Sequence, residues 1–185
     1  MSPRIRRAKR MLSLQPPEGE SWYWVTVTIA GSITFRALGI HARRILDYLL
    51  LEHASHAGLE NGNLGAAYSS LAKFGVTEDD IPKGLAELMA TGFIRCEHRA
   101  HRVAAGGDPS RYAITWFPTR VGTKAEAPAT HDWKRVLEGL HRLNVGNVKQ
   151  AKAWLKTEIV GSIGGWRQKK RPTPHLRLVN PSLAG

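Results

Sequence analysis

The sequence contains a single cysteine, Cys96, among 185 residues. An intramolecular disulfide is therefore impossible, and a zinc site built on several cysteines is excluded. Long apolar runs are also lacking, because the longest, residues 22–29, is far shorter than the roughly 20 residues of a membrane-spanning helix. The basic N-terminus is followed by residues 15–18 (QPPE) rather than by the apolar stretch of a secretory signal. These absences predict a cytoplasmic protein that is not exported by that route.

Acidic residues are scarce relative to basic ones. The chain has 15 Asp and Glu against 27 Lys and Arg, a formal net charge of +12. Such a balance attracts polyanions and speeds encounters with them at low salt. Nucleic acid is the obvious candidate and implies a location at the nucleoid, but an anionic membrane surface or an acidic protein would attract the same charge.

Both ends of the chain have little apolar material. Residues 1–21 hold five basic side chains and a Pro-Pro pair, and residues 166–177 hold five basic side chains and no acidic one. Such segments bury too little apolar surface to offset the loss of conformational entropy on ordering. We therefore predict a flexible basic arm at residues 1–21 and a basic tail at residues 166–185.

The middle of the chain divides into three parts. Residues 22–118 predict an α+β domain, and residues 119–130, which include Gly122 and Pro128, predict a linker. Residues 131–165 predict a helical extension. One apolar stripe of that extension is formed by Trp133, Val136, Leu137 and Leu140.

Hydrophobic periodicity places the elements of residues 22–118. Spacings of three and four residues predict helices at about 35–56, at 67–74, and from Asp79 or Asp80 to Gly92, with Thr77 as a cap for the third helix. Its buried stripe is Ile81, Leu85, Leu88 and Met89. Aromatic and β-branched residues predict strands at 93–97 and 112–117, a short strand at 63–65, and either a strand or an extended segment across the core at 22–29.

The order of these elements resembles the winged helix-turn-helix superfamily. The residues that carry the likeness are 71–76 (LAKFGV), 81–88 and 91–94 (TGFI), where a helix ends on glycine and a strand follows at once. Residues 52–64, 74–76 and 110–115 resemble small bacterial proteins of plasmids, phages and integrative elements. The resemblance spans about residues 35–117. It implies three helices and a β-hairpin wing that bind DNA.

In such a domain the third helix enters the major groove and the wing contacts an adjacent backbone. The candidate DNA-binding residues are Lys73, Thr77 and Lys83 in the helices, Arg99, His101, Arg102 and Arg111 in the wing, Arg6 and Arg7 in the arm, and Lys169, Lys170 and Arg171 in the tail. The outer face of the third helix is not basic, since it comprises Asp79, Lys83, Glu87 and Ala90. Base reading by this helix and a merely solvated face are therefore both open.

No motif indicates catalysis. His53 and His56 lie three residues apart but have no apparent third ligand, and Cys96, His98 and His101 are explained better as parts of a wing. We expect no metal, no cofactor, no small-molecule ligand and no enzyme activity. The six tryptophans predict core packing rather than a platform for stacking bases.

The sequence thus predicts a double-stranded DNA-binding protein, with homodimerisation left open. It would serve as a transcriptional regulator or as a replication or recombination accessory factor of a mobile element. The alternative is a protein-interaction module that docks on a polymerase or replisome while its tails bind nucleic acid nonspecifically.

Overall fold

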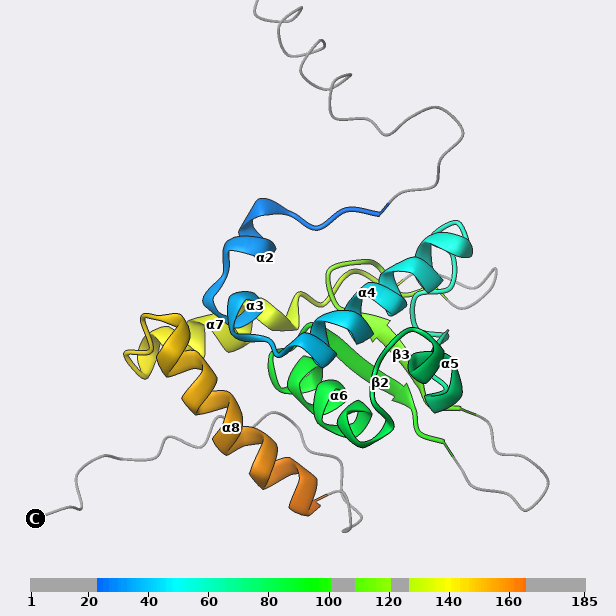
Figure 1. Ribbon diagram of the computed structural model, residues 1–185. Helices are drawn as coiled ribbons and strands as arrows, with labels where there is room; N and C mark the ends of the chain where they lie inside the picture. Colours follow the sequence, from blue (N-terminus) through cyan, green and yellow to red (C-terminus); the bar gives the residue numbers. More distant parts are fainter. Residues whose placement is uncertain (1–22, 101–108, 121–126, 166–185) are drawn as a thin grey trace, which may run out of the picture.

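The computed structural model describes residues 23–100, 109–120 and 127–165 (Figure 1). The fold is α+β, with helices packed around a three-stranded antiparallel sheet. Its elements are α2 (Val27–Gly31), α3 (Ile33–Ala37), α4 (Ile40–Ser55), β1 (Leu64–Gly65), α5 (Tyr68–Lys73), the 3-10 turn η1 (Glu78–Asp80), α6 (Ile81–Ala90), β2 (Ile94–His98), β3 (Arg111–Ile114), α7 (Asp132–Arg142) and α8 (Val148–Gly165). Within these ranges every helix is too short or too polar to span a membrane.

Two short helices, α2 and α3, follow Trp24 in the chain. The prediction of a strand at residues 22–29 is wrong for its described part, because Val27 already lies in α2. The Oγ1 of Thr26 caps this helix by accepting a hydrogen bond from the Ile29 N–H at 3.2 Å, and Ser32 caps α3 in the same way. No strand of the described sheet pairs with this segment, so β-branched residues gain nothing here from an extended conformation. The capping hydrogen bonds therefore decide in favour of helices.

Helices α3 and α4 occupy the region where the sequence predicts one helix from Phe35. The helical path is interrupted at Leu38, whose φ of −54° and ψ of 138° are extended. The Gly39 N–H, at the start of α4, donates to Glu87 Oε2 at 2.8 Å. A carboxylate at this end satisfies an unpaired N–H and complements the helix dipole. Glu87 is 48 residues away, so local periodicity carries no sign of the break.

The sheet has the strand order β1–β3–β2, with β3 antiparallel to both neighbours. Strands β2 and β3 form a two-stranded ribbon, and the predicted short strand is β1. Arg111, the first residue of β3, lies between the two other strands, because its Cα partners are Gly65 on β1 and His98 on β2.

Strand β3 ends at Ile114, three residues before the predicted end. The cause is the fully buried amide of Asn61, which accepts from the Ile114 N–H at 2.7 Å and donates to the Ile114 carbonyl at 2.9 Å. The same Nδ2 lies 3.1 Å from the carbonyl oxygens of Phe117 and Pro118. Because one side chain binds all three residues, the backbone turns here instead of continuing along the sheet.

Helix α6 packs against α4, β2 and α8 and lies at the centre of the molecule (Figure 1). Its approach to α4 requires Gly84, since a Cβ there would lie 2.6 Å from Ile45 Cδ1 and 3.2 Å from the Ala42 nitrogen. The predicted stripe is largely confirmed: Ile81, Leu85 and Leu88 are buried, and Met89 is partly buried against the core. Within α6, Lys83 is the one exposed residue.

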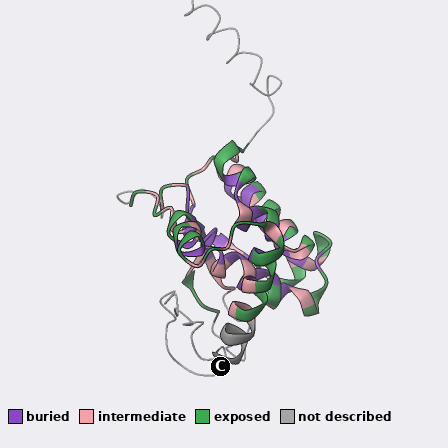
Figure 2. Cartoon of the chain, turned by 90° about the vertical axis from the view of Figure 1, so that its left-hand side faces the viewer, coloured by how far each residue is buried: buried purple, intermediate pink, exposed green. Residues whose placement is uncertain are grey.

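The two C-terminal helices complete this core. On α7, Trp133, Val136 and Leu140 are buried, and Leu137 packs against them. On α8, Ala151 and Leu155 are buried, and the helix packs on α3 and α6. Figure 2 shows buried residues on the inner sides of the helices and exposed residues outside. The predicted linker is tied at both ends of its described part, because Thr119 and Ala127 form an antiparallel bridge.

Aromatic side chains fill the junction between the sheet and α4. Trp116 and Trp133 are buried, as core packing predicts. The Trp24 ring lies edge-on to Phe117 at 5.0 Å between centroids, and the buried His53 ring lies 4.6 Å from the same phenyl group. His53 is therefore enclosed by apolar material at the end of α4.

We predict that Gly92→Ala will lower the free energy of unfolding by about 2 kcal/mol or more. Gly92 has a φ of 71°, and a Cβ would lie 2.8 Å from the Asp132 carbonyl carbon and the Trp133 nitrogen. The left-handed conformation alone costs alanine about 1–2 kcal/mol, and the α7 backbone cannot retreat without moving Trp133. Denaturant unfolding measures the loss.

The matched control is Gly146→Ala, because a Cβ at Gly146 would meet nothing within 4 Å. Its free energy of unfolding should change by less than about 0.5 kcal/mol. Equal losses in the two variants would contradict a tight junction between α6 and α7.

We also predict that stability falls as the pH drops below about 6.5. Burial lowers the pKa of His53 from its ordinary value of 6.5. Below pH 6.5 the unfolded chain binds a proton at this histidine that the folded chain does not bind. The free energy of unfolding therefore keeps its maximum contribution from His53 above pH 6.5 and declines below it. Denaturant unfolding across this range should show a shallower decline for His53→Gln. A decline of the same size in that variant would assign the effect to other groups.

Candidate nucleic-acid interface

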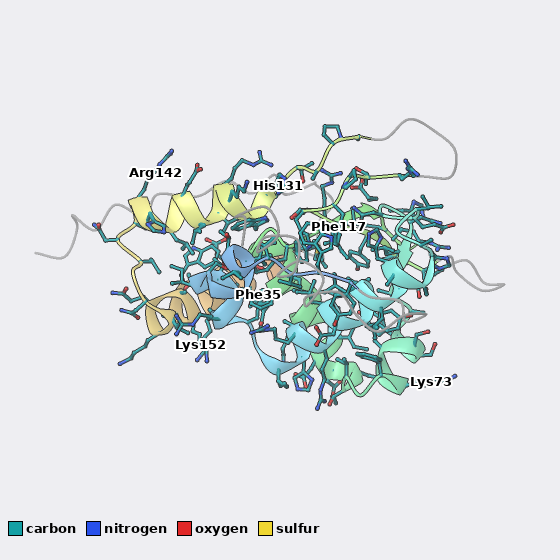
Figure 3. All side chains as sticks on the ribbon, turned by 90° about the horizontal axis from the view of Figure 1, so that it is seen from above. Phe35, Lys73, Phe117, His131, Arg142 and Lys152 are labelled. Carbon is teal, nitrogen blue, oxygen red and sulfur yellow. The ribbon has the colours of Figure 1, made fainter. Side chains whose placement is uncertain are left out.

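The predicted helical residues lie around the turn between α5 and α6. Lys73, Thr77 and Lys83 are all exposed. Lys73 is the last residue of α5, and Figure 3 shows its side chain at the edge of the molecule. Thr77 does not act as predicted, because its side chain makes no capping hydrogen bond. Its backbone carbonyl instead accepts from the N–H groups of Asp80 and Ile81.

Charges at the start of α6 are mixed. The Lys83 Nζ lies 3.3 Å from Asp80 Oδ1, and the His41 Nε2 lies 3.4 Å from Asp80 Oδ2. Glu78 and Asp79 are exposed beside them, where acidic groups complement the helix dipole. A phosphate approaching this turn would meet carboxylates as well as Lys83, so this end of α6 is a poor binding site for a polyanion.

The predicted outer face of the third helix is confirmed in part. Asp79 and Lys83 are exposed, and Glu87 and Ala90 are partly exposed. The Glu87 carboxylate binds Gly39, and α8 packs against the helix. In the described structure the one exposed side chain of α6 therefore lies in its first turn, and the later part of this face is only partly open to solvent.

The ribbon carries the other described candidates. Arg99 is exposed directly after β2, whereas Arg111 is half-buried and its guanidinium donates to the Asn63 carbonyl at 3.3 Å. On β2, Arg95 pairs with Glu97 at 2.5 Å. The remaining predicted residues lie outside the described chain: His101, Arg102, Arg6, Arg7, Lys169, Lys170 and Arg171.

Two ionisable groups of the ribbon, Cys96 and Tyr112, carry no charge. Burial raises the pKa of the Cys96 thiol, and the nearby Arg99 only partly offsets this effect. Burial also raises the pKa of Tyr112 to about 12. Both groups stay neutral at physiological pH, so neither adds a negative charge that would weaken the attraction of Arg99 and Arg111 for an anion.

Two exposed residues, one beside the ribbon and one beside the turn between α5 and α6, were not predicted. Tyr68, at the start of α5, is 47% exposed, and the Ala66 N–H just before this helix donates to the Ser110 carbonyl at 3.4 Å, which places the start of α5 beside the ribbon. Arg44 is exposed on α4, and its guanidinium donates to the Gly75 carbonyl at 2.5 Å. The signal for Arg44 was available, because it lies opposite the leucine stripe of α4. Nothing in the local sequence distinguishes Tyr68 from a core aromatic residue.

No cluster of three or more His, Cys, Asp or Glu side chains that could hold a metal occurs in the described part of the chain. Comparison with protein-family models, with curated proteins and with solved structures finds no match to this chain. Any functional assignment therefore depends on the residues and geometry described above.

Proposed function

We propose that this chain binds double-stranded DNA through a winged helix-turn-helix fold and that most of its contacts are to backbone phosphates. In this assignment α4, α5 and α6 are the three helices, and the ribbon of β2 and β3 is the wing. The strand order β1–β3–β2 supports it, since the first short strand then joins the wing to form one sheet. The net charge of +12 supplies the long-range attraction.

The observation that carries the proposal is the position of the ribbon beside α5. Arg99 is exposed where β2 ends, and Arg102 follows within the connection. Tyr68 and Lys73 lie at the two ends of the adjacent helix α5, both exposed. A ribbon and a helix side by side supply two protruding elements to neighbouring stretches of one duplex.

Backbone binding fits this structure better than base reading. Phosphate contacts position a protein but carry no sequence information directly, whereas base reading needs side chains that enter a groove. Helix α6 exposes one lysine beside three acidic residues, which is a poor set for either purpose. An architectural or accessory role in transcription, replication or recombination of a mobile element is therefore favoured over recognition of one operator by α6.

A protein-interaction role is the second candidate, favoured by the outer side of α4. Ile40 and Leu51 on this helix are 61% and 46% exposed, and Phe74, 38% exposed, packs on Tyr48 of the same helix. Exposed apolar side chains grouped in this way are typical of protein contacts. A module of this kind would not show ribbon-dependent binding to duplex DNA.

The test is binding of the full chain to a fluorescent duplex of about two helical turns, with salt varied between about 50 and 200 mM. We predict that replacing Arg99 and Arg102 with Ala lowers affinity about tenfold or more and reduces the salt dependence by about two charges, as expected for lost phosphate contacts. The loss should be similar for duplexes of different sequence.

The matched control removes two exposed charges from α7, Lys134→Ala with Arg142→Ala. This control should leave affinity within about twofold of the wild type, because charges distant from the duplex are screened. Identical titration curves for wild type and the Arg99/Arg102 variant would overturn the assignment of the ribbon as a DNA contact.

A further inference from the structure

Helix α8 is amphipathic in a way that separates charge from apolar surface. Its inner side is formed by Ala151 and Leu155, both buried, with Val148 and Trp154 partly buried. The exposed residues between Lys149 and Thr157 recur at helical spacing on the opposite side. They are Lys149, Gln150, Lys152, Ala153, Lys156 and Thr157.

This outer side holds three lysines and no acidic residue. Lys149, Lys152 and Lys156, here called the α8 lysine stripe, are spaced three and four residues apart, so they lie along one face of the helix. None of them forms an ion pair with a described residue, whereas Lys83 on α6 and Arg135 on α7 both do. A row of unpaired like charges does not stabilise a helix, so the stripe has no evident structural purpose.

The dimensions of the stripe match a nucleic-acid backbone. From Lys149 to Lys156 the helix rises about 10 Å, and phosphates of one strand follow each other at about 3.4 Å along the duplex axis. Three amines over this length can reach about three phosphates of one strand. The sequence directly after α8 is also basic, with five Lys and Arg and no acidic residue at positions 166–177.

The position of α8 in the fold also favours a DNA contact by this helix rather than by α6. It packs against α6 and α3, so it covers the helix that a winged helix-turn-helix would use for the major groove. Figure 3 shows Lys152 toward one end of the molecule and Lys73, the last residue of α5, at the other. The stripe is thus a basic surface separate from the ribbon.

We infer that the α8 lysine stripe is a second DNA-binding surface, which contacts the phosphate backbone of the duplex independently of the ribbon. This inference rests on the proposed function, since it assigns a second contact to the same duplex ligand. We assign this contact to α8 rather than to α6, because α8 packs against α6 and Lys83 is the one exposed residue of α6.

The experiment uses the full chain and the same fluorescent duplex, titrated across the same salt range. Replacing Lys149, Lys152 and Lys156 with Gln should lower affinity at least about tenfold and reduce the salt dependence by about three charges. Replacing the same three residues with Arg keeps the charge and should restore both quantities. All three side chains are exposed, and the melting temperature should confirm that each variant is folded.

The matched control removes three exposed charges from α7, Lys134→Gln, Arg135→Gln and Arg142→Gln. An equal effect of this control would overturn the inference, because net charge alone would then explain the loss. Unchanged duplex binding by the α8 variant also overturns it, as does loss of binding to anionic phospholipid vesicles with duplex binding unaffected.

The two proposals can fail separately. If the Arg99/Arg102 variant loses affinity and the α8 variant does not, the ribbon assignment stands and only the stripe fails. If the wild type does not bind duplex DNA, the proposed function itself fails.

Discussion

The close approach of α6 to α4 at Gly84 is the contact on which the remaining structure depends. Any side chain there would meet Ile45 and the α4 backbone. Because the two helices approach closely, the Glu87 carboxylate reaches the Gly39 N–H and sets the start of α4. The other sides of α6 are covered by β2 and α8. The helix that the sequence resemblance assigns to DNA reading is therefore a core element over most of its length.

This enclosure explains how charge is distributed over the surface. The exposed turn before α6 carries Glu78, Asp79 and Asp80, and Lys83 pairs with Asp80 alone, so negative charge is in excess there. Positive charge without acidic neighbours occurs instead on the outer side of α8, and arginines border the ribbon. A polyanion is attracted most strongly where exposed carboxylates are absent, which favours elements at the periphery over the start of the central helix.

The parts of the fold that were predicted correctly depend on local patterns. Apolar spacing located the main body of α4 and the buried stripes of α6 and α7. Glycine located the ends of α5 and α6, where Gly75 and Gly92 adopt positive φ. Two errors occur where distant groups decide: Asn61 ends β3 from 53 residues away, and Glu87 binds the start of α4 from 48 residues away. The third has a local cause, because the Thr26 side chain caps α2 within the segment predicted as a strand.

By itself the sequence determined the α+β class, the basic character of the chain and the residues able to face a core, because composition and periodicity act within a few residues. Only the tertiary structure decided which of those faces stay exposed. Of the residues expected on the outer side of α6, Glu87 and Ala90 are only partly exposed, whereas the lysines of α8 are exposed, since exposure depends on which helix packs on which. Contacts between residues far apart in the chain set that choice, and no local pattern encodes them.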